Sequence, residues 1–224
     1  MATTKKVKAK AKSTVSHEKI RGAYREFLLT EGKKPASVYK FCVDNGMKEE
    51  DFYHHFSSFE ALEKSIWKEY ITETADKLSG DDSYASFSSR EKILTFYFTL
   101  AELLKKDRSF VLHQLQDWKN PAVTPGFLKG FKGAFDEWIK GVLNEGKQTG
   151  EVAKRPYLDD RYNSLFWLHL MFILQFWSND ESPGFEKTDM AIEKSVNLAY
   201  DLIGKGVLDN ALDFGKFLYQ NSRN

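Results

Sequence analysis

The sequence has few of the residues that support covalent, redox or metal chemistry. Cys42 is the single cysteine among 224 residues, so an intramolecular disulfide is impossible and a reducing compartment fits. The histidines lack a metal-ligand spacing such as HxxxH, since they are scattered at His17, His54, His55, His113 and His169. The chain also has no phosphate-binding glycine loop, no GxSxG motif and no nucleophile with a matching base. These absences predict a protein that is not an enzyme and uses no cofactor or metal.

Long apolar runs are missing as well. The N-terminal stretch MATTKKVKAKAKSTVS is rich in lysine but has no apolar core, so it is not a secretory signal. The most hydrophobic run, Leu165 to Trp177, is interrupted by His169 and Gln175. It is shorter than the roughly 20 apolar residues that a membrane span needs. We therefore expect a soluble, cytoplasmic protein with no membrane span.

Helical periodicity runs through almost the whole chain. Apolar residues make up 42% of the sequence and aromatic residues 15%, which is ample material for a core. From Ser16 to Thr30 the apolar residues follow the spacing i, i+3, i+4, i+7, i+8, which indicates a helix. Further helices are predicted over residues 58–78, 88–104, 107–118, 124–142, 159–177 and 188–206, and Leu208 to Tyr219 is expected to cap the domain as a short extra helix. No strand pattern appears, so the predicted fold class is all-α.

The stretch from Pro35 to Leu62 carries the strongest local signals. Val38, Phe41 and Cys42 form one apolar stripe of a short helix, for which Ser37 is the expected N-cap. Asn45-Gly46 favours a sharp turn after it, because both residues tolerate a left-handed backbone. Phe52 and Phe56 mark a second short helix. Helix, glycine turn and helix is the shape of a helix-turn-helix.

Capping signals mark three later helix starts. Ser57 and Glu60 form a capping-box pattern before the 58–78 helix, and Ser88 and Glu91 form another before the 88–104 helix. Thr124-Pro125 matches an N-cap followed by proline at the first helical position.

Residues 17–67 resemble the TetR family of bacterial transcriptional regulators. The resemblance rests on Ser37-Val38, on Asn45-Gly46-Met47, on the aromatic block FYHHF at 52–56 and on the Glu-Ala-Leu start of the next helix at 60–62. It implies a basic tail (residues 1–15), a DNA-binding helix-turn-helix domain (16–64) and an effector-binding and dimerisation domain (65–224). In such proteins the last two long helices pair with the same helices of a second subunit to form a homodimer. The helix after the helix-turn-helix transmits effector binding to the DNA-binding units.

The resemblance also implies which residues contact operator DNA. The recognition helix runs from about Lys48 to His55, and the expected contacts are Lys34, Ser37, Lys40, Lys48, Glu49, Tyr53, His54 and Lys64. The five lysines of the tail either follow phosphates or form a solubilising segment. Two features depart from the family: the acidic run Glu49-Glu50-Asp51, and Phe59 where relatives carry a phosphate-binding lysine. The acidic run either repels the DNA or complements the positive end of the helix dipole.

Aromatic side chains predict what the larger domain binds. The expected pocket residues are Phe96, Phe110, Trp118, Phe131, Phe135, Trp138, Phe166 and Trp167. Such stripes are also typical of a packed core, but together they favour a large apolar or aromatic ligand. Two functions follow. The first is a ligand-responsive repressor. The second is a TetR-fold protein that has lost DNA binding and holds a lipid or isoprenoid, like the ubiquinone-biosynthesis accessory protein of this fold.

Overall fold

The computed structural model describes residues 15–221 except 117, 119, 121, 122, 156, 157 and 205. Throughout the described part of the chain the regular elements are helices and no strand occurs, so the all-α prediction is confirmed. The chain divides into two compact units, Met1–Glu63 and Lys64–Asn224. The predicted lysine-rich tail falls almost wholly outside the described residues.

Between residues 15 and 63 the N-terminal unit contains three helices and the start of a fourth. These are α1 (His17–Glu31), α2 (Val38–Asp44), α3 (Glu49–His55) and the first residues of α4 (Phe59–Ser79). Ser16 caps α1 by accepting from the N–H of Lys19, and Gly32 ends the helix at a φ of 64°. Ser37 caps α2 as expected, since its hydroxyl accepts from the N–H of Lys40 at 3.2 Å.

Aromatic rings form the centre of this unit. Phe41 of α2 contacts Phe52 of α3 edge-on at 6.2 Å between ring centroids, and Phe59 of α4 lies 5.6 Å from Phe41 and 5.4 Å from Phe52. Tyr24 of α1 stacks on Phe59 at 5.4 Å. All four helices therefore meet at one aromatic cluster, which fixes the angle between α2 and α3.

The start of α4 differs from the predicted capping box. Ser58 is the cap, because its hydroxyl accepts from the N–H of Ala61 at 3.2 Å and its carbonyl accepts from the N–H of Leu62. The prediction for Ser57 and Glu60 was wrong by one residue. Two adjacent serines offer the same local signal, so the sequence pattern alone does not distinguish them.

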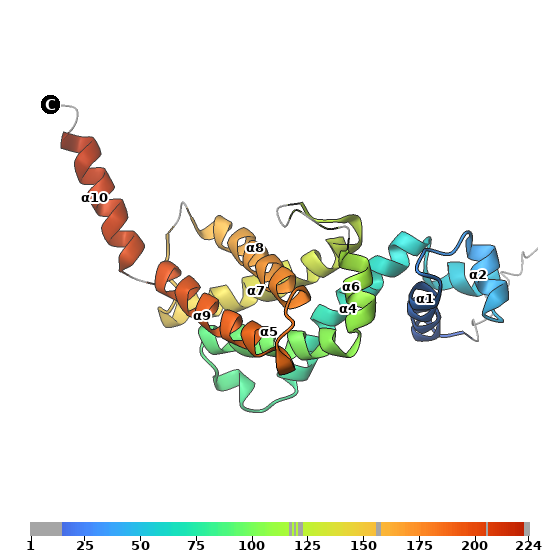
Figure 1. Ribbon diagram of the computed structural model, residues 1–224. Coiled ribbons are helices and arrows are strands. Elements are labelled where there is room, and N and C mark those ends of the chain that lie inside the picture. Colours follow the sequence, from blue (N-terminus) through green and yellow to red (C-terminus); the bar gives the residue numbers. More distant parts are fainter. Residues whose placement is uncertain are drawn as a thin grey trace, which may run out of the picture. The chain divides into compact units, whose positions relative to one another are not determined.

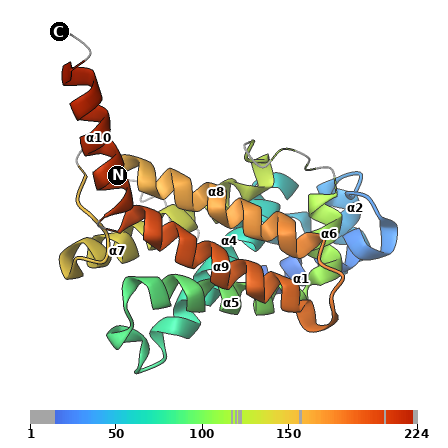
Figure 2. The same cartoon turned by 60° about the vertical axis from the view of Figure 1, so that its left-hand side comes forward.

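The second unit is a bundle of longer helices. It holds the rest of α4, then α5 (Ser89–Lys106), α6 (Arg108–Leu115), α7 (Lys129–Thr149), α8 (Asp159–Ser178), α9 (Glu186–Ile203) and α10 (Val207–Asn221), with single 3-10 turns at Tyr84–Ser86, Gly126–Leu128 and Pro183–Phe185. Helix α5 packs against α7 and α9, and α8 packs against the same two helices (Figures 1 and 2).

The capping predictions in this unit had different outcomes. The Ser88–Glu91 box is confirmed: the N–H of Ser88 donates to Glu91 Oε2 at 2.8 Å, and the N–H of Glu91 donates to Ser88 Oγ at 3.2 Å. The Thr124-Pro125 prediction was wrong. Pro125 precedes the short 3-10 turn, α7 begins at Lys129, and the Thr124 hydroxyl accepts from the indole of Trp167 at 3.2 Å.

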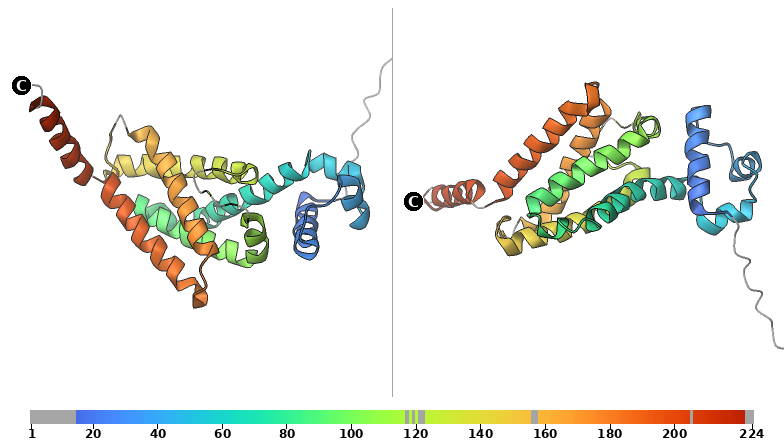
Figure 3. Two further views of the ribbon diagram at one scale, coloured as in Figure 1. Left: turned by 45° about the horizontal axis from the view of Figure 1, so that its top comes forward. Right: turned by 90° about the horizontal axis from the view of Figure 1, so that it is seen from below.

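The last helix does not cap the domain, contrary to expectation. Helix α10 extends away from the bundle beyond the end of α9 (Figures 1 and 3). Residues 213–221 are exposed throughout. The amphipathic pattern was therefore real, but nothing within the described part of this chain covers its apolar face.

Candidate functional site

The turn between α2 and α3 presents α3 as a separate, rigid helix. Gly46 adopts a φ of 62°, a conformation that side chains with a Cβ rarely adopt. The N–H of Met47 then donates back to the carbonyl of Cys42 at 2.8 Å, and the Asn45 amide donates to the carbonyl of Phe41 at 2.8 Å. The turn is thus held from both sides, and the helix, turn and helix of the sequence prediction are present.

Helix α3 buries one face and exposes the other. Phe52 is fully buried and Phe56 nearly so, whereas Tyr53 is 52% exposed and His54 is also exposed. Lys48 and Glu49 are exposed at the start of the helix. The predicted recognition residues therefore share one accessible face, as the periodicity of an α-helix requires.

The acidic first turn of α3 has a structural role. Asp51 Oδ2 accepts from the N–H of Lys48 at 3.3 Å, and Glu49 and Glu50 occupy the same turn. Carboxylates at this end satisfy free backbone donors and complement the helix dipole, which contributes roughly 0.3–1 kcal/mol each.

Lys34 is held within the protein by an ion pair. Its ammonium donates to Glu63 Oε2 at 2.8 Å, and Glu63 is only 2% exposed. The other oxygen of Glu63 accepts from the Tyr24 hydroxyl at 2.7 Å, and burial together with this carboxylate raises the pKa of Tyr24 far above its ordinary value. Glu63 thus joins α1, the α1–α2 loop and α4. The sequence analysis missed this group, because an acid in an amphipathic helix has no local mark of burial.

The remaining predicted cations have different surroundings. Lys40 pairs with Asp44 one helical turn later at 2.9 Å, and both groups are exposed. Lys64 lies in the second unit and is half-buried. Its carbonyl faces Gly130 of α7 so closely that a Cβ on Gly130 would lie 2.5 Å from the oxygen. Of the four predicted lysines, Lys34 and Lys40 therefore have their charge matched by a carboxylate.

Phe59 explains why a phosphate-binding lysine is missing at that position. The ring takes part in the aromatic centre with Tyr24, Phe41 and Phe52. The position is therefore used for packing in this chain.

Most of the predicted pocket aromatics fill the interior of the second unit. Phe96 of α5 stacks on Trp138 of α7 with ring centroids 3.7 Å apart, and Phe135 contacts both rings at about 6 Å. Trp167 of α8 completes this group through Phe131 at 6.1 Å and Phe135 at 6.2 Å. These five side chains are in contact with one another as a packed cluster.

The other three predicted pocket residues lie outside that cluster. Phe166 contacts His169 and Tyr200, and Phe110 is buried on α6. The indole of Trp118 donates to the carbonyls of Asn120 and Val123, and its ring borders a hollow of about 360 Å³ at α6 and the end of α8. The structure does not bring all eight residues around one cavity.

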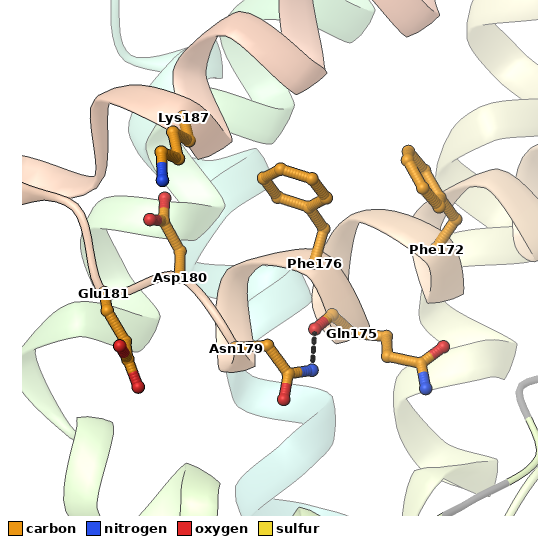
Figure 4. Close-up of a pocket in the computed structure, with 7 residues that line it drawn as sticks. All are labelled: Phe172, Gln175, Phe176, Asn179, Asp180, Glu181 and Lys187. Atoms are coloured by element: carbon orange, nitrogen blue, oxygen red, sulfur yellow. Dashed lines mark hydrogen bonds between the residues drawn. The ribbon is translucent and has the colours of Figure 1, made fainter.

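Two further hollows involve α8. One, of about 410 Å³, lies at the end of this helix and contains Phe172, Phe176 and Lys187 together with acidic and amide groups (Figure 4). The other is a narrow apolar void of about 10 Å³ between α5 and α8. Its lining consists of Tyr97, Leu100, Ala101, Leu104, Leu170, Ile173, Leu174 and Trp177.

A half-buried histidine lies close to this void. His169 Nε2 is 2.7 Å from Ser195 Oγ, and its Nδ1 is 3.4 Å from the Tyr97 hydroxyl. Ser195 donates its own proton to the carbonyl of Ala191, so it accepts from His169 Nε2–H and leaves Nδ1 unprotonated. Burial lowers the pKa of His169 to about 4.

Neither a metal-binding cluster nor a membrane-spanning helix occurs in the residues that the structure describes. Among the described residues, no group of three or more His, Cys, Asp and Glu side chains is placed to hold a metal ion. None of the described helices is both long and apolar enough to cross a membrane.

Comparison with known proteins assigns the family. The family model described as "Tetracyclin repressor-like, C-terminal domain" matches residues 92–218, more than half of the chain. The chain belongs to the TetR family. No curated protein matches this TetR-family sequence.

Solved structures share the fold of this TetR-family protein at low sequence identity. A TetR-family transcription regulator from Shewanella sp. PV-4 is similar with a TM-score of 0.59 and 14% identity, over 84% of this chain and 97% of that chain. The fatty acid degradation regulator FadR from Bacillus halodurans has a TM-score of 0.53 and 18% identity, over 88% and 98%. FadR from Bacillus subtilis, solved in complex with stearoyl-CoA, has a TM-score of 0.50 and 17% identity, over 86% and 100%.

Proposed function

We propose that this TetR-family protein is a transcriptional repressor that binds operator DNA as a homodimer. The observation that supports DNA binding is the presentation of α3. Tyr53 and His54 project from a helix whose opposite face is fixed in an aromatic core. A helix held in this way can enter a major groove as one rigid element, with its outer side chains on base edges and phosphates.

Helices α8 and α9 support the dimer. Leu165, Leu168, Phe172 and Phe176 recur along one side of α8, and Met190, Leu198 and Leu202 along one side of α9; all seven are exposed. Exposed apolar stripes on neighbouring helices are typical of an interface between subunits. Pairing with the same two helices of a second copy would cover both stripes.

The ion pairs limit which cations can neutralise phosphates. Lys34 would have to leave a buried carboxylate, and Lys40 would have to leave Asp44. We therefore assign the electrostatic part of binding to Lys48, Lys64 and the lysines of residues 5–12. Each phosphate neutralised makes the plot of log affinity against log salt steeper by about 0.9.

This assignment is tested with DNA duplexes recovered by in vitro selection. Binding is measured by fluorescence anisotropy from 50 to 200 mM KCl for the full chain, for a chain lacking residues 1–14, and for His54→Ala and Tyr53→Ala. We expect the truncated chain to have a shallower salt slope, and each α3 variant to bind roughly 5–100-fold more weakly. Gln148→Ala, an exposed change in the other unit, is the control. Unchanged affinity in both α3 variants would contradict the proposal.

We further propose that the effector carries a long apolar chain. The void between α5 and α8 is lined by aliphatic and aromatic side chains, and at about 10 Å³ it would have to widen to admit an apolar chain. A FadR of the same fold is solved with stearoyl-CoA. The dimer has one state in which the spacing of its two DNA-binding units matches the operator and another in which it does not. An effector that binds the second state more tightly lowers operator affinity by the difference between its binding energies for the two states. Titration of the protein–DNA complex with acyl-CoA thioesters of increasing length tests this, and release that does not depend on chain length would contradict it.

The second candidate is a TetR-fold lipid- or isoprenoid-binding protein that has lost DNA binding. The acidic first turn of α3 favours it, because Glu49 and Glu50 are exposed beside the residues that would face a polyanion. This function predicts co-purified lipid in native mass spectrometry and no selected DNA sequence.

A further inference from the structure

Helix α10 is held at its base by a buried arginine. Arg155, 6% exposed, donates from Nε and Nη2 to the two oxygens of Asp209 at 2.8 and 3.0 Å. It also donates to the carbonyls of Ile203 and Gly204 and to the Tyr162 hydroxyl. A guanidinium that binds the end of α9 and the first turn of α10 together fixes the direction in which α10 leaves the bundle.

The exposed part of α10 carries an uncovered apolar face. Phe214, Phe217 and Leu218 follow the spacing i, i+3, i+4, and Tyr219 lies next to Leu218 at the edge of this face; all four are more than half exposed. A large side chain of this kind has roughly 150–250 Å² of surface, and each of the four exposes roughly 100 Å² of it to solvent. Together they expose about 400 Å². A face of this size is as large as the biggest apolar patch of an ordinary monomer.

The surface area that a stable dimer buries indicates which partner covers the apolar face of α10. The seven exposed side chains of α8 and α9 present roughly 550 Å², at about 80 Å² each. Obligate homodimers bury at least about 1000 Å² per subunit, which is close to the sum of the two faces. The α9 stripe ends at Leu202, five residues before α10 begins, so one partner can cover both.

The charges on α10 argue against a membrane or a nucleic acid as the partner of its apolar face. The described exposed part of α10 carries Asp213 and Lys216, which form an ion pair with each other, while Asp209 is bound to Arg155. Helices that lie on anionic membranes or nucleic acid carry an excess of Lys and Arg on the polar face, and α10 has none.

We propose that α10 is a dimerisation arm, which packs its apolar face on the second copy of this chain. The inference rests on the proposed homodimer and adds a contact to it. The arm extends the dimer interface beyond α8 and α9. The dimer therefore has a lower dissociation constant than α8 and α9 alone would give it.

Hydrogen exchange and sedimentation of the full chain test the arm. We expect the amides of residues 213–221 to be protected in the dimer and unprotected in Phe172→Glu, an α8 change chosen to separate the subunits. We expect Phe217→Ser to raise the dimer dissociation constant about tenfold or more, while Gln220→Ser, on the same exposed helix, changes it less than twofold. Far-ultraviolet circular dichroism checks that each variant is folded.

The outcomes separate this inference from the proposed function. An intact dimer with unprotected α10 amides would overturn the arm alone, and so would protection of α10 in the monomer. A chain that stays monomeric at all concentrations would overturn the homodimer and the arm together. Binding of α10 to phosphatidylglycerol vesicles that leaves its amides unprotected in the free dimer would assign the face to a membrane and overturn the arm.

Discussion

His169 gives the sharpest test of how the second unit is packed. The imidazole lies between α5 and α9, where Nε2–H donates to Ser195 and Nδ1 faces the Tyr97 hydroxyl. Protonation of Nδ1 would place a charge in an apolar interior and a second N–H against the hydroxyl. His169→Gln removes the titration but keeps an amide that can donate to Ser195 and accept from Tyr97.

The magnitude follows from the two pKa values. Burial lowers the pKa of His169 from 6.5 to about 4 in the folded protein, whereas the unfolded chain keeps the ordinary value. The unfolded state therefore binds more protons between pH 6.5 and pH 4. The stability supplied by the neutral imidazole is complete above pH 6.5 and is lost as the pH falls to about 4. At about 1.4 kcal/mol per pKa unit, the loss reaches about 3 kcal/mol.

Urea unfolding at a series of pH values between 7.5 and 4 measures this loss. The wild-type free energy of unfolding should fall more steeply with decreasing pH than that of His169→Gln, and the two curves should differ in shape below pH 6.5. Carboxylates that titrate in the same range act equally on both proteins, so the difference between the curves isolates the imidazole. Parallel curves over the whole range would refute the assignment of a neutral His169 whose pKa is lowered in the folded protein.

Two further changes test packing elsewhere. Gly130→Ala should lower the free energy of unfolding in urea by about 1–3 kcal/mol, because the added Cβ would lie 2.5 Å from the carbonyl oxygen of Lys64. Gly133→Ala has open space around the added Cβ, so it should raise the free energy of unfolding in the same assay by up to about 1 kcal/mol. Tyr24→Phe should destabilise by about 1.5–3 kcal/mol in thermal unfolding, since the buried Glu63 carboxylate loses one donor, and an unchanged melting temperature would contradict the role given to Glu63.

The sequence was most informative where local chemistry decides the backbone. Ser37 marks the start of α2 through its side-chain acceptor and Gly46 marks the turn after it through a left-handed φ, and both positions were predicted. The i, i+4 spacing of Phe52 and Phe56 places them on one side of α3, and both side chains are buried. The exposed face of α3 follows from the same period, so the orientation of Tyr53 and His54 was predictable without coordinates.

Contacts between distant residues could not be read in this way. Glu63 pairs with Tyr24, 39 residues away, and Arg155 pairs with Asp209, 54 residues away; neither pair has a sequence signal. The same holds for the aromatic set of the second unit. Helical periodicity places each ring on an inward face of its helix. Only the folded structure shows that Phe96 and Trp138 stack on each other, while Trp118 lies outside their cluster.

The end of the chain illustrates a different limit. Amphipathic periodicity showed that α10 has an apolar face, and the expectation was that the domain itself would cover it. The Arg155 contacts turn the helix outward, and this depends on residues in the α7–α8 loop. Periodicity indicates that a face needs a partner, but it does not identify the partner.

Selection of duplexes from a random DNA library by the intact chain tests the central claim, that α3 reads DNA. The proposed repressor should enrich one near-palindromic site with two half-sites about one helical turn, or a multiple of it, apart, as two copies of one recognition helix require. Failure to enrich any sequence at low salt, with a folded protein, would contradict the claim and favour the lipid-binding function.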